Sequence, residues 1–165
     1  VQIAKISGAT VITTSSRIDQ RQRLIELGAI AALDYRDPDL AQQIYAANGG
    51  QPIDRIIDAE VGANLATSFE VLREGGAIAG YGSFRVPNPE LSFLTMMFKN
   101  ITMSAILVYL LKEYDAKHYA AILRKMLVTG QLQMPVAAAL EMDAVAEAHQ
   151  IVEAGSREGA VVLTL

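Results

Sequence analysis

Near the N-terminus, two serines and an arginine follow a run of β-branched residues and could bind a charged ligand. The segment Thr13-Thr14-Ser15-Ser16-Arg17 carries hydroxyl groups and a guanidinium, and it contains no acid. Such donors are suitable partners for a phosphate group. A structural interpretation also exists, in which Ser16 caps the next helix and Asp19 completes a loose capping box. The two roles can coexist, so the segment predicts a phosphate-binding turn at the start of a helix.

Two further clusters contain groups that could act in chemistry. Asp58 and Glu60 could form a pair of carboxylates for acid–base work, but the sequence supplies no partner for them, which favours a structural role. Tyr81-Gly82-Ser83 combines a glycine, which lets the chain approach a ligand closely, with a hydroxyl donor. An ordinary turn explains the second cluster almost as well.

Metal chemistry has little support in the sequence. The chain has no cysteine, which excludes disulfides and thiolate metal sites. Its two histidines, His118 and His149, stand within expected helices and are not spaced as a metal cluster. We therefore assign both to surface or packing roles.

The elements that must position these residues alternate between strands and helices along the whole chain. The expected strands are Ala9–Thr14, Ala31–Tyr35, Ile53–Asp58, Ala77–Gly80, Ile101–Tyr109 and Ala160–Leu165. The expected helices are Val1–Ser7, Arg17–Leu27, Asp39–Ala47, Ala63–Leu72, Ser92–Phe98, His118–Val128 and Ala144–Val152, with a tight break at Gly75-Gly76. This pattern predicts an α/β fold in three layers, with a parallel sheet between helices. Ligands in such sheets bind beyond the carboxyl ends of the strands, which is where the candidate clusters lie.

Composition excludes several classes of protein. The 165 residues are 52% hydrophobic and 19% charged, which is too apolar for a disordered chain and fits one domain. The formal charge of −4 argues against a broad nucleic-acid interface. No apolar run approaches the roughly 18 residues of a membrane span, and the N-terminus does not resemble a signal peptide. We expect a soluble cytoplasmic protein that contacts neither nucleic acid nor membrane.

Several strings together resemble the nucleotide-binding half of the medium-chain dehydrogenase/reductase superfamily, especially its zinc-free, zeta-crystallin-like quinone oxidoreductases. Each string is weak alone, but their order and spacing cover the whole chain. They are Val1–Ile12, Glu26-Leu-Gly-Ala29, Asp34-Tyr-Arg-Asp37, Val61-Gly-Ala-Asn-Leu65, Gly75-Gly-Ala-Ile-Ala-Gly-Tyr-Gly82, Met97-Phe-Lys-Asn100 and Gly159-Ala-Val-Val-Leu163.

The resemblance implies a Rossmann-type sheet that binds NADPH, since a basic residue in place of an acid after the second Rossmann strand accommodates the 2′-phosphate. Ser15, Ser16 and Arg17 would hold this phosphate, although many relatives carry a lysine where Gln20 stands. Tyr35 would pack beside the adenosine phosphate, or alternatively be a half-buried tyrosine whose hydroxyl caps a loop. We interpret Arg36 as a surface charge.

The resemblance also implies the other contacts of the cofactor. The backbone around Ala59 and Val61 would line the adenosine and nicotinamide-ribose cleft, and the backbone from Leu107 to Leu110 would face the carboxamide. The cluster of Tyr81, Gly82 and Ser83 would approach the cofactor too. No catalytic residue and no metal ligand can be named in this chain.

The family's first Rossmann strand and its glycine-rich loop are missing from the sequence, as is the N-terminal catalytic domain. We therefore expect residues 1–165 to be a fragment of a nucleotide-binding domain. In a Rossmann sheet the first strand lies between the second and the fourth. The strands Ala9–Thr14 and Ile53–Asp58 should therefore lack the neighbour that would bridge them.

For the parent protein these observations predict transfer of hydride from NADPH to a quinone without zinc. An enoyl or alkenal reductase and a zinc-type alcohol dehydrogenase of the same superfamily remain alternatives. A nucleotide-binding or interaction module without turnover is a third. The long apolar strand Ile101–Tyr109 would be a sheet edge, and it either pairs with a second copy in a homodimer or is covered by its own helix and loop.

Overall fold

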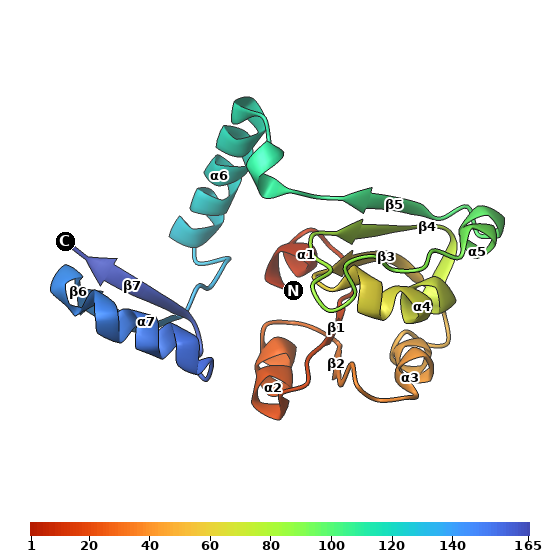
Figure 1. Cartoon of the computed structure of the whole chain (residues 1–165), viewed down its shortest axis with the longest axis horizontal. Helices are drawn as coiled ribbons and strands as arrows, with labels where there is room; N and C mark the ends of the chain where they lie inside the picture. The colour runs from red at the N-terminus through yellow and green to blue at the C-terminus, as the bar shows by residue number, and fades with distance from the viewer. The chain divides into compact units, whose positions relative to one another are not determined.

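The computed structural model describes all residues from Val1 to Leu165, which form two compact units (Figure 1). The first unit comprises Val1–Leu111, and the second comprises Lys112–Leu165. All strand pairs in both units are parallel, which confirms the predicted α/β class. No helix is both long enough and apolar enough to cross a membrane.

The first unit alternates helices with strands. Its helices are α1 (Gln2–Ile6), α2 (Ile18–Glu26), α3 (Leu40–Ala47), α4 (Val61–Val71) and α5 (Phe93–Phe98), and a single 3₁₀ turn, η1, spans Val108–Leu110. Its strands are β1 (Ile12–Thr14), β2 (Ala31–Leu33), β3 (Ile53–Asp58), β4 (Leu72–Gly80) and β5 (Thr102–Ala105). The alternation therefore follows the predicted order, although β1, β2 and β5 are shorter than predicted and β4 is longer.

The strands of this unit form two sheets, with no hydrogen-bonded ladder between β1 and β3. One sheet has the order β1-β2, and the other has the order β3-β4-β5. A cavity of about 390 Å³ is lined by residues of both β1 and β3, and the side chain of Ile57 on β3 is 74% exposed. β1 and β3 thus each keep one unpaired edge and line the same cavity, as expected for strands that lack a bridging neighbour.

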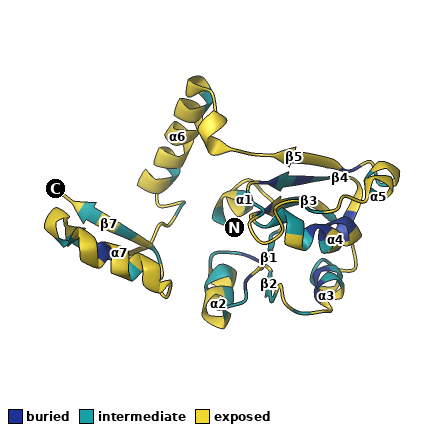
Figure 2. Ribbon diagram, in the orientation of Figure 1, coloured by how far each residue is buried: buried dark blue, intermediate teal, exposed yellow.

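Helix α4 carries several buried residues (Figure 2), and its apolar ones belong to two hydrophobic clusters. One cluster unites Leu65 and Phe69 of α4 with Leu72, Ile78 and Ile101. A smaller cluster unites Val71 with Leu40 and Ile44 of α3. Burying each large side chain contributes about 1.5–3 kcal/mol, so these two clusters hold β3, β4 and α3 around α4.

Lys99, which follows α5, holds the C-terminal end of α4. Its ammonium group donates hydrogen bonds to the carbonyl oxygens of Phe69, Glu70 and Leu72, at 2.6, 3.0 and 2.9 Å. The last carbonyls of a helix have no partner within the helix, and a cation placed there also opposes the negative end of the helix dipole. This contact fixes the turn between α5 and β5.

Two local predictions in the first unit are wrong. The segment 101–109 is not one long strand, because β5 ends at Ala105 opposite the last residue of β4, Gly80, and the chain then has no strand to pair with. The glycines at 75 and 76 do not separate a helix from a strand. They lie inside β4, where the register against β3 shifts and the φ angle of Gly75 is +67°.

The second unit contains α6 (Glu113–Val128), the strands β6 (Val136–Glu141) and β7 (Ala160–Thr164), and α7 (Val145–Ala154), which a 3₁₀ turn (Met142–Ala144) precedes. The strand β6, which the sequence pattern did not predict, pairs with β7. Gly155 ends α7 in the left-handed conformation, with a φ angle of +68°. His118 on α6 stacks on the ring of Tyr114 and meets the ring of Tyr119 edge to face, in agreement with a packing role.

Candidate functional site

The turn after β1 is held by its own hydrogen bonds. The Ser15 hydroxyl donates to the side-chain oxygen of Gln20 at 2.8 Å and accepts the backbone N–H of Arg17 at 3.3 Å. The N-cap position of α2 is Arg17, and no side chain caps the helix there, so the expected capping box from Ser16 to Asp19 is wrong. The Arg17 guanidinium pairs with Asp19 instead, and Nε donates to Oδ1 at 3.2 Å.

The turn after β2 brings a second arginine to the turn after β1. The Arg36 guanidinium donates from Nη2 to the carbonyl oxygen of Ser16 at 3.0 Å. It also pairs with Asp34, through Nη2 at 2.7 Å and Nε at 3.0 Å. Arg36 is therefore part of this strand end and not an isolated surface charge. The sequence offered one signal, which is that Asp34 and Arg36 flank Tyr35 at the end of the neighbouring strand.

The charges of this cluster reinforce one another. The hydrogen bond from the Arg36 side chain is the largest cause that holds the pKa of the Asp34 carboxyl far below its usual range. The same pair raises the pKa of the Arg36 guanidinium, and the hydrogen bond from Arg17 lowers the pKa of Asp19. Opposite charges at hydrogen-bond distance favour both ionised forms. The pKa shifts of Asp19, Asp34 and Arg36 thus all favour the ionised forms.

Tyr35 stands between these two charged residues and is 40% exposed. Together with Thr14 at the end of β1 and Asp58 at the end of β3, it lines the cavity of about 390 Å³ between the two sheets. The structure shows no hydrogen bond from its hydroxyl to another part of the chain, so the loop-capping role that we considered is not formed.

The two carboxylates after β3 have structural partners. Asp58 is buried and accepts the backbone N–H of Glu60 at 2.8 Å and the side-chain amide of Asn64 at 3.0 Å. Glu60 accepts the backbone N–H groups of Phe84 and Arg85, both at 3.0 Å. Asp58 thus orders the turn into α4, and Glu60 ties the loop after β4 to this turn.

The turn after β4 is locked against the start of α4. The Ser83 hydroxyl donates to the carbonyl of Val86 at 2.6 Å and accepts the N–H of Gly62 at 3.0 Å. The N–H of Val61 donates to the carbonyl of Gly82 at 3.0 Å. A Cβ at Gly82 would collide with the carbonyl oxygen of Ala59. The Ser83 hydroxyl therefore uses its hydrogen bonds within the fold. Tyr81, in contrast, is 60% exposed and has its side chain accessible to a ligand.

A hollow of about 800 Å³ brings one set of the predicted residues together. It is lined by Val61 at the start of α4, by residues 80–83 at and after the end of β4 and by residues 103–107 along and after β5. Among the predicted residues, it collects Val61, Tyr81, Gly82, Ser83 and Leu107, with Ala59 adjoining through Gly82. Ser15, Ser16, Arg17 and Tyr35 form a separate set at the ends of β1 and β2. No group of three or more His, Cys, Asp or Glu side chains is arranged to hold a metal ion.

Comparison with known proteins agrees with this architecture. A family model described as "zinc-binding dehydrogenase" matches residues 1–125. The quinone oxidoreductase of Homo sapiens is 24% identical over 99% of this chain, and the 2-haloacrylate reductase of Burkholderia sp is 26% identical over 97%. The chain spans about half the length of each of these relatives, 50% and 49% respectively.

Solved structures show the same fold. The crystal structure of a 2-haloacrylate reductase superposes with a TM-score of 0.86 at 24% identity, covering 100% of this chain and 52% of the other. The Escherichia coli quinone oxidoreductase in complex with NADPH superposes with a TM-score of 0.81 at 20% identity, covering 99% and 52%. Both matches extend over both units, so the predicted Rossmann-like fold is confirmed.

Proposed function

Because the chain belongs to the zinc-binding dehydrogenase family, we propose that it binds NADPH and that the whole protein reduces a quinone without zinc. The turn after β1 carries the cofactor part of this proposal. It has no acid to accept a ribose 2′-hydroxyl, and it combines two serines with Arg17 and the Arg36 guanidinium. Acids at this position favour NAD, and basic residues favour NADP.

The residues present fit such a cofactor. The larger hollow exposes backbone close to glycines 80 and 82, where a side chain would collide with Val61 or with Ala59. Backbone groups there can therefore approach a flat ligand closely. We assign the 2′-phosphate to Ser15, Ser16 and Arg17, the adenosine phosphate to Tyr35, and the remaining contacts to Ala59, Val61, Tyr81, Gly82, Leu107 and the backbone of Ser83.

When bound, NADPH supplies the hydride, and the protein supplies position and electrostatics. In this chain, the hydrogen bonds of Glu60 and Ser83 hold the loop after β4 in place beside the hollow. Exposed Tyr81 and Leu107 provide apolar surface at its rim. The human and Escherichia coli quinone oxidoreductases among the relatives support a quinone as acceptor. The cysteine-free sequence fits the reducing cytoplasm in which we place this reaction.

Titration of the protein with NADPH and NADH tests the cofactor assignment. We expect NADPH to bind at least about tenfold more tightly, which corresponds to about 1.4 kcal/mol. Arg17→Ala should weaken NADPH binding and leave NADH nearly unchanged. Equal losses for both cofactors would contradict phosphate recognition by Arg17. Quinone-dependent oxidation of NADPH, with metal analysis of the same sample, then tests the reaction and its independence of zinc.

A second candidate function is reduction of a polarised carbon–carbon double bond. The 2-haloacrylate reductase relative favours it, at 26% identity over 97% of this chain. The same cofactor site would serve both reactions, because the hydride donor is the same. Parallel assays with a quinone and with an enone or 2-haloacrylate at equal concentration distinguish them by the larger kcat/KM.

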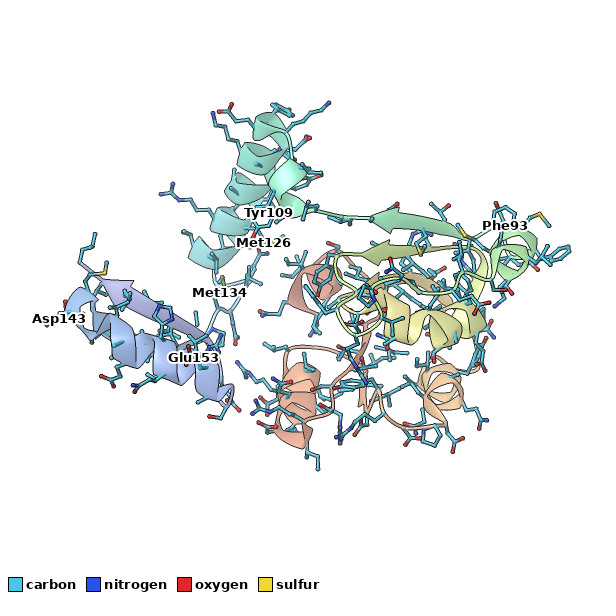
Figure 3. The ribbon with its side chains drawn as sticks, viewed as in Figure 1. Phe93, Tyr109, Met126, Met134, Asp143 and Glu153 are labelled. Atoms are coloured by element: carbon cyan, nitrogen blue, oxygen red, sulfur yellow. The ribbon has the colours of Figure 1, made fainter.

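We also propose that β5 and the segment after it form the interface of a homodimer. Residues 106–111 are all large, apolar and exposed, and Tyr109 among them is 88% exposed (Figure 3). Ile106 donates its N–H to Gly80, so by alternation the N–H of Ala105 points to the free edge. Ala105→Pro removes that donor without cutting the ladder to β4, and should halve the mass measured by light scattering. A wild-type monomer, or an unchanged dimer in the variant, would refute this interface.

A further inference from the structure

Arg36 takes part in a cluster of three charges that encloses the turn after β1. The Asp34 carboxylate pairs with Arg36 and also with Arg21, whose Nη1 lies 3.2 Å from Oδ2. Arg21 donates to the carbonyl oxygen of Ser15 at 2.8 Å, and Arg36 donates to that of Ser16 at 3.0 Å. The two guanidiniums therefore hold successive carbonyls of the same turn, and one acid orients both of them.

The acid in this cluster has no remaining capacity to accept a ligand hydroxyl. Oδ1 of Asp34 accepts the backbone N–H and the Nε–H of Arg36, both at 3.0 Å. Oδ2 accepts from Arg36 at 2.7 Å and from Arg21 at 3.2 Å. A carboxylate offers about four acceptor positions, and all four are used. Asp34 thus stands near the place where a ribose would bind, but it cannot serve as the acid that selects a 2′-hydroxyl.

Arg36, in contrast to Asp34, keeps hydrogen-bond donors that no other group in the chain uses. A guanidinium has five N–H groups, and Arg36 uses its Nε–H and both hydrogens of Nη2. The two N–H groups of Nη1 have no partner in the chain, and the side chain is 63% exposed. Because two guanidiniums face one carboxylate, the cluster keeps one net positive charge, and Arg36 is its exposed member. Arg17 differs, since its charge is balanced by Asp19.

We propose that Arg36, oriented by Asp34, joins Ser15, Ser16 and Arg17 around the 2′-phosphate and contributes selectivity for a phosphomonoester over a free hydroxyl on the ribose bound beside β1. This proposal rests on the proposed binding of NADPH and adds one residue to those that contact its 2′-phosphate. A guanidinium whose plane is already fixed loses little conformational freedom on binding, and its free edge can donate two hydrogen bonds to phosphate oxygens.

The test compares ligands that differ only in this phosphate. The protein is titrated with 2′,5′-ADP and 5′-AMP, which carry no nicotinamide, and with NADPH and NADH. Arg36→Ala should weaken 2′,5′-ADP and NADPH about 20-fold, because hydrogen bonds between charged groups are lost, and should change 5′-AMP and NADH less than about twofold. Arg36→Lys keeps the positive charge but lacks the planar pair of N–H donors of a guanidinium. It should weaken the binding of 2′,5′-ADP and NADPH by an intermediate amount.

The exposed arginine Arg124 of α6 provides the matched control, and Arg124→Ala should leave all four affinities unchanged. An unchanged melting temperature of the Arg36→Ala protein shows that a loss is not one of folding. If Arg36→Ala leaves 2′,5′-ADP binding unchanged, or weakens 5′-AMP equally, Arg36 does not select the phosphate, while the binding of NADPH itself can still stand. If the wild-type protein binds neither NADPH nor 2′,5′-ADP, the proposed function fails and this inference fails with it.

Discussion

The strand ends of the first unit use their polar residues in two different ways. After β3 and β4, Asp58, Glu60 and Ser83 each bind backbone N–H groups of neighbouring turns. After β1 and β2, charged side chains bind one another and leave a guanidinium edge exposed. We call these the closed end and the open end. Side chains at the closed end shape the backbone around a hollow, whereas a side chain at the open end remains available to a charged ligand.

The largest effect should come from crowding at the closed end. In Gly82→Ala the new Cβ meets the carbonyl oxygen of Ala59 and lies 3.2 Å from the ring of Phe84, so the turn must move. We expect a loss of about 3 kcal/mol in the free energy of unfolding, measured by urea denaturation.

Gly8→Ala is the control for this substitution. Gly8 has a φ angle of +85° but no atom within 4 Å of the added Cβ, so this change costs only about 1–2 kcal/mol of backbone strain. If the two variants lose equal stability, crowding does not define the closed end.

A smaller effect should follow from loss of a buried acceptor. Asp58→Ala leaves the N–H of Glu60 and the amide of Asn64 without their partner, and should cost about 2 kcal/mol in urea denaturation. Asp58→Asn keeps one oxygen that can accept the N–H of Glu60, so it should cost clearly less.

At the open end, Asp34→Ala should lower the free energy of unfolding less than Asp58→Ala does, because exposed ion pairs contribute little. The reverse order would show that the open end, too, is built for stability.

The smallest effect is the pH dependence of the open end. Asp34 has a folded-state pKa below its usual value of about 3.9, chiefly because Arg36 donates to its carboxylate. Its contribution to stability is therefore present above about pH 4 and is lost as the pH falls toward the folded-state pKa. Melting temperatures of wild type and Asp34→Asn should differ at pH 7 and converge as the pH falls below about 4. A difference that stays constant down to pH 2.5 would contradict this pairing.

The class of fold and the order of its elements follow from the local pattern of residues. Apolar β-branched runs alternate with helical spacing, and this local pattern is enough to predict parallel strands and the positions of most helices. The sequence also indicated that the segments 9–14 and 53–58 would lack a common neighbour, and no ladder joins β1 to β3. Local pattern did not predict where β5 ends, because a strand ends where its partner ends, at Gly80.

The roles of individual site residues depended on the tertiary structure. A hydroxyl such as that of Ser83 is a possible ligand donor in any sequence, and only its neighbours, Gly62 and Val86, show that it is committed to the fold. Arg36 is an ordinary surface arginine by sequence, and only the approach of β2 to β1 places it on the carbonyl of Ser16. The reason is that these donors and acceptors bond to partners from segments far apart in the chain. The spacing of residues in the sequence therefore does not show which hydrogen-bonding groups remain unpaired.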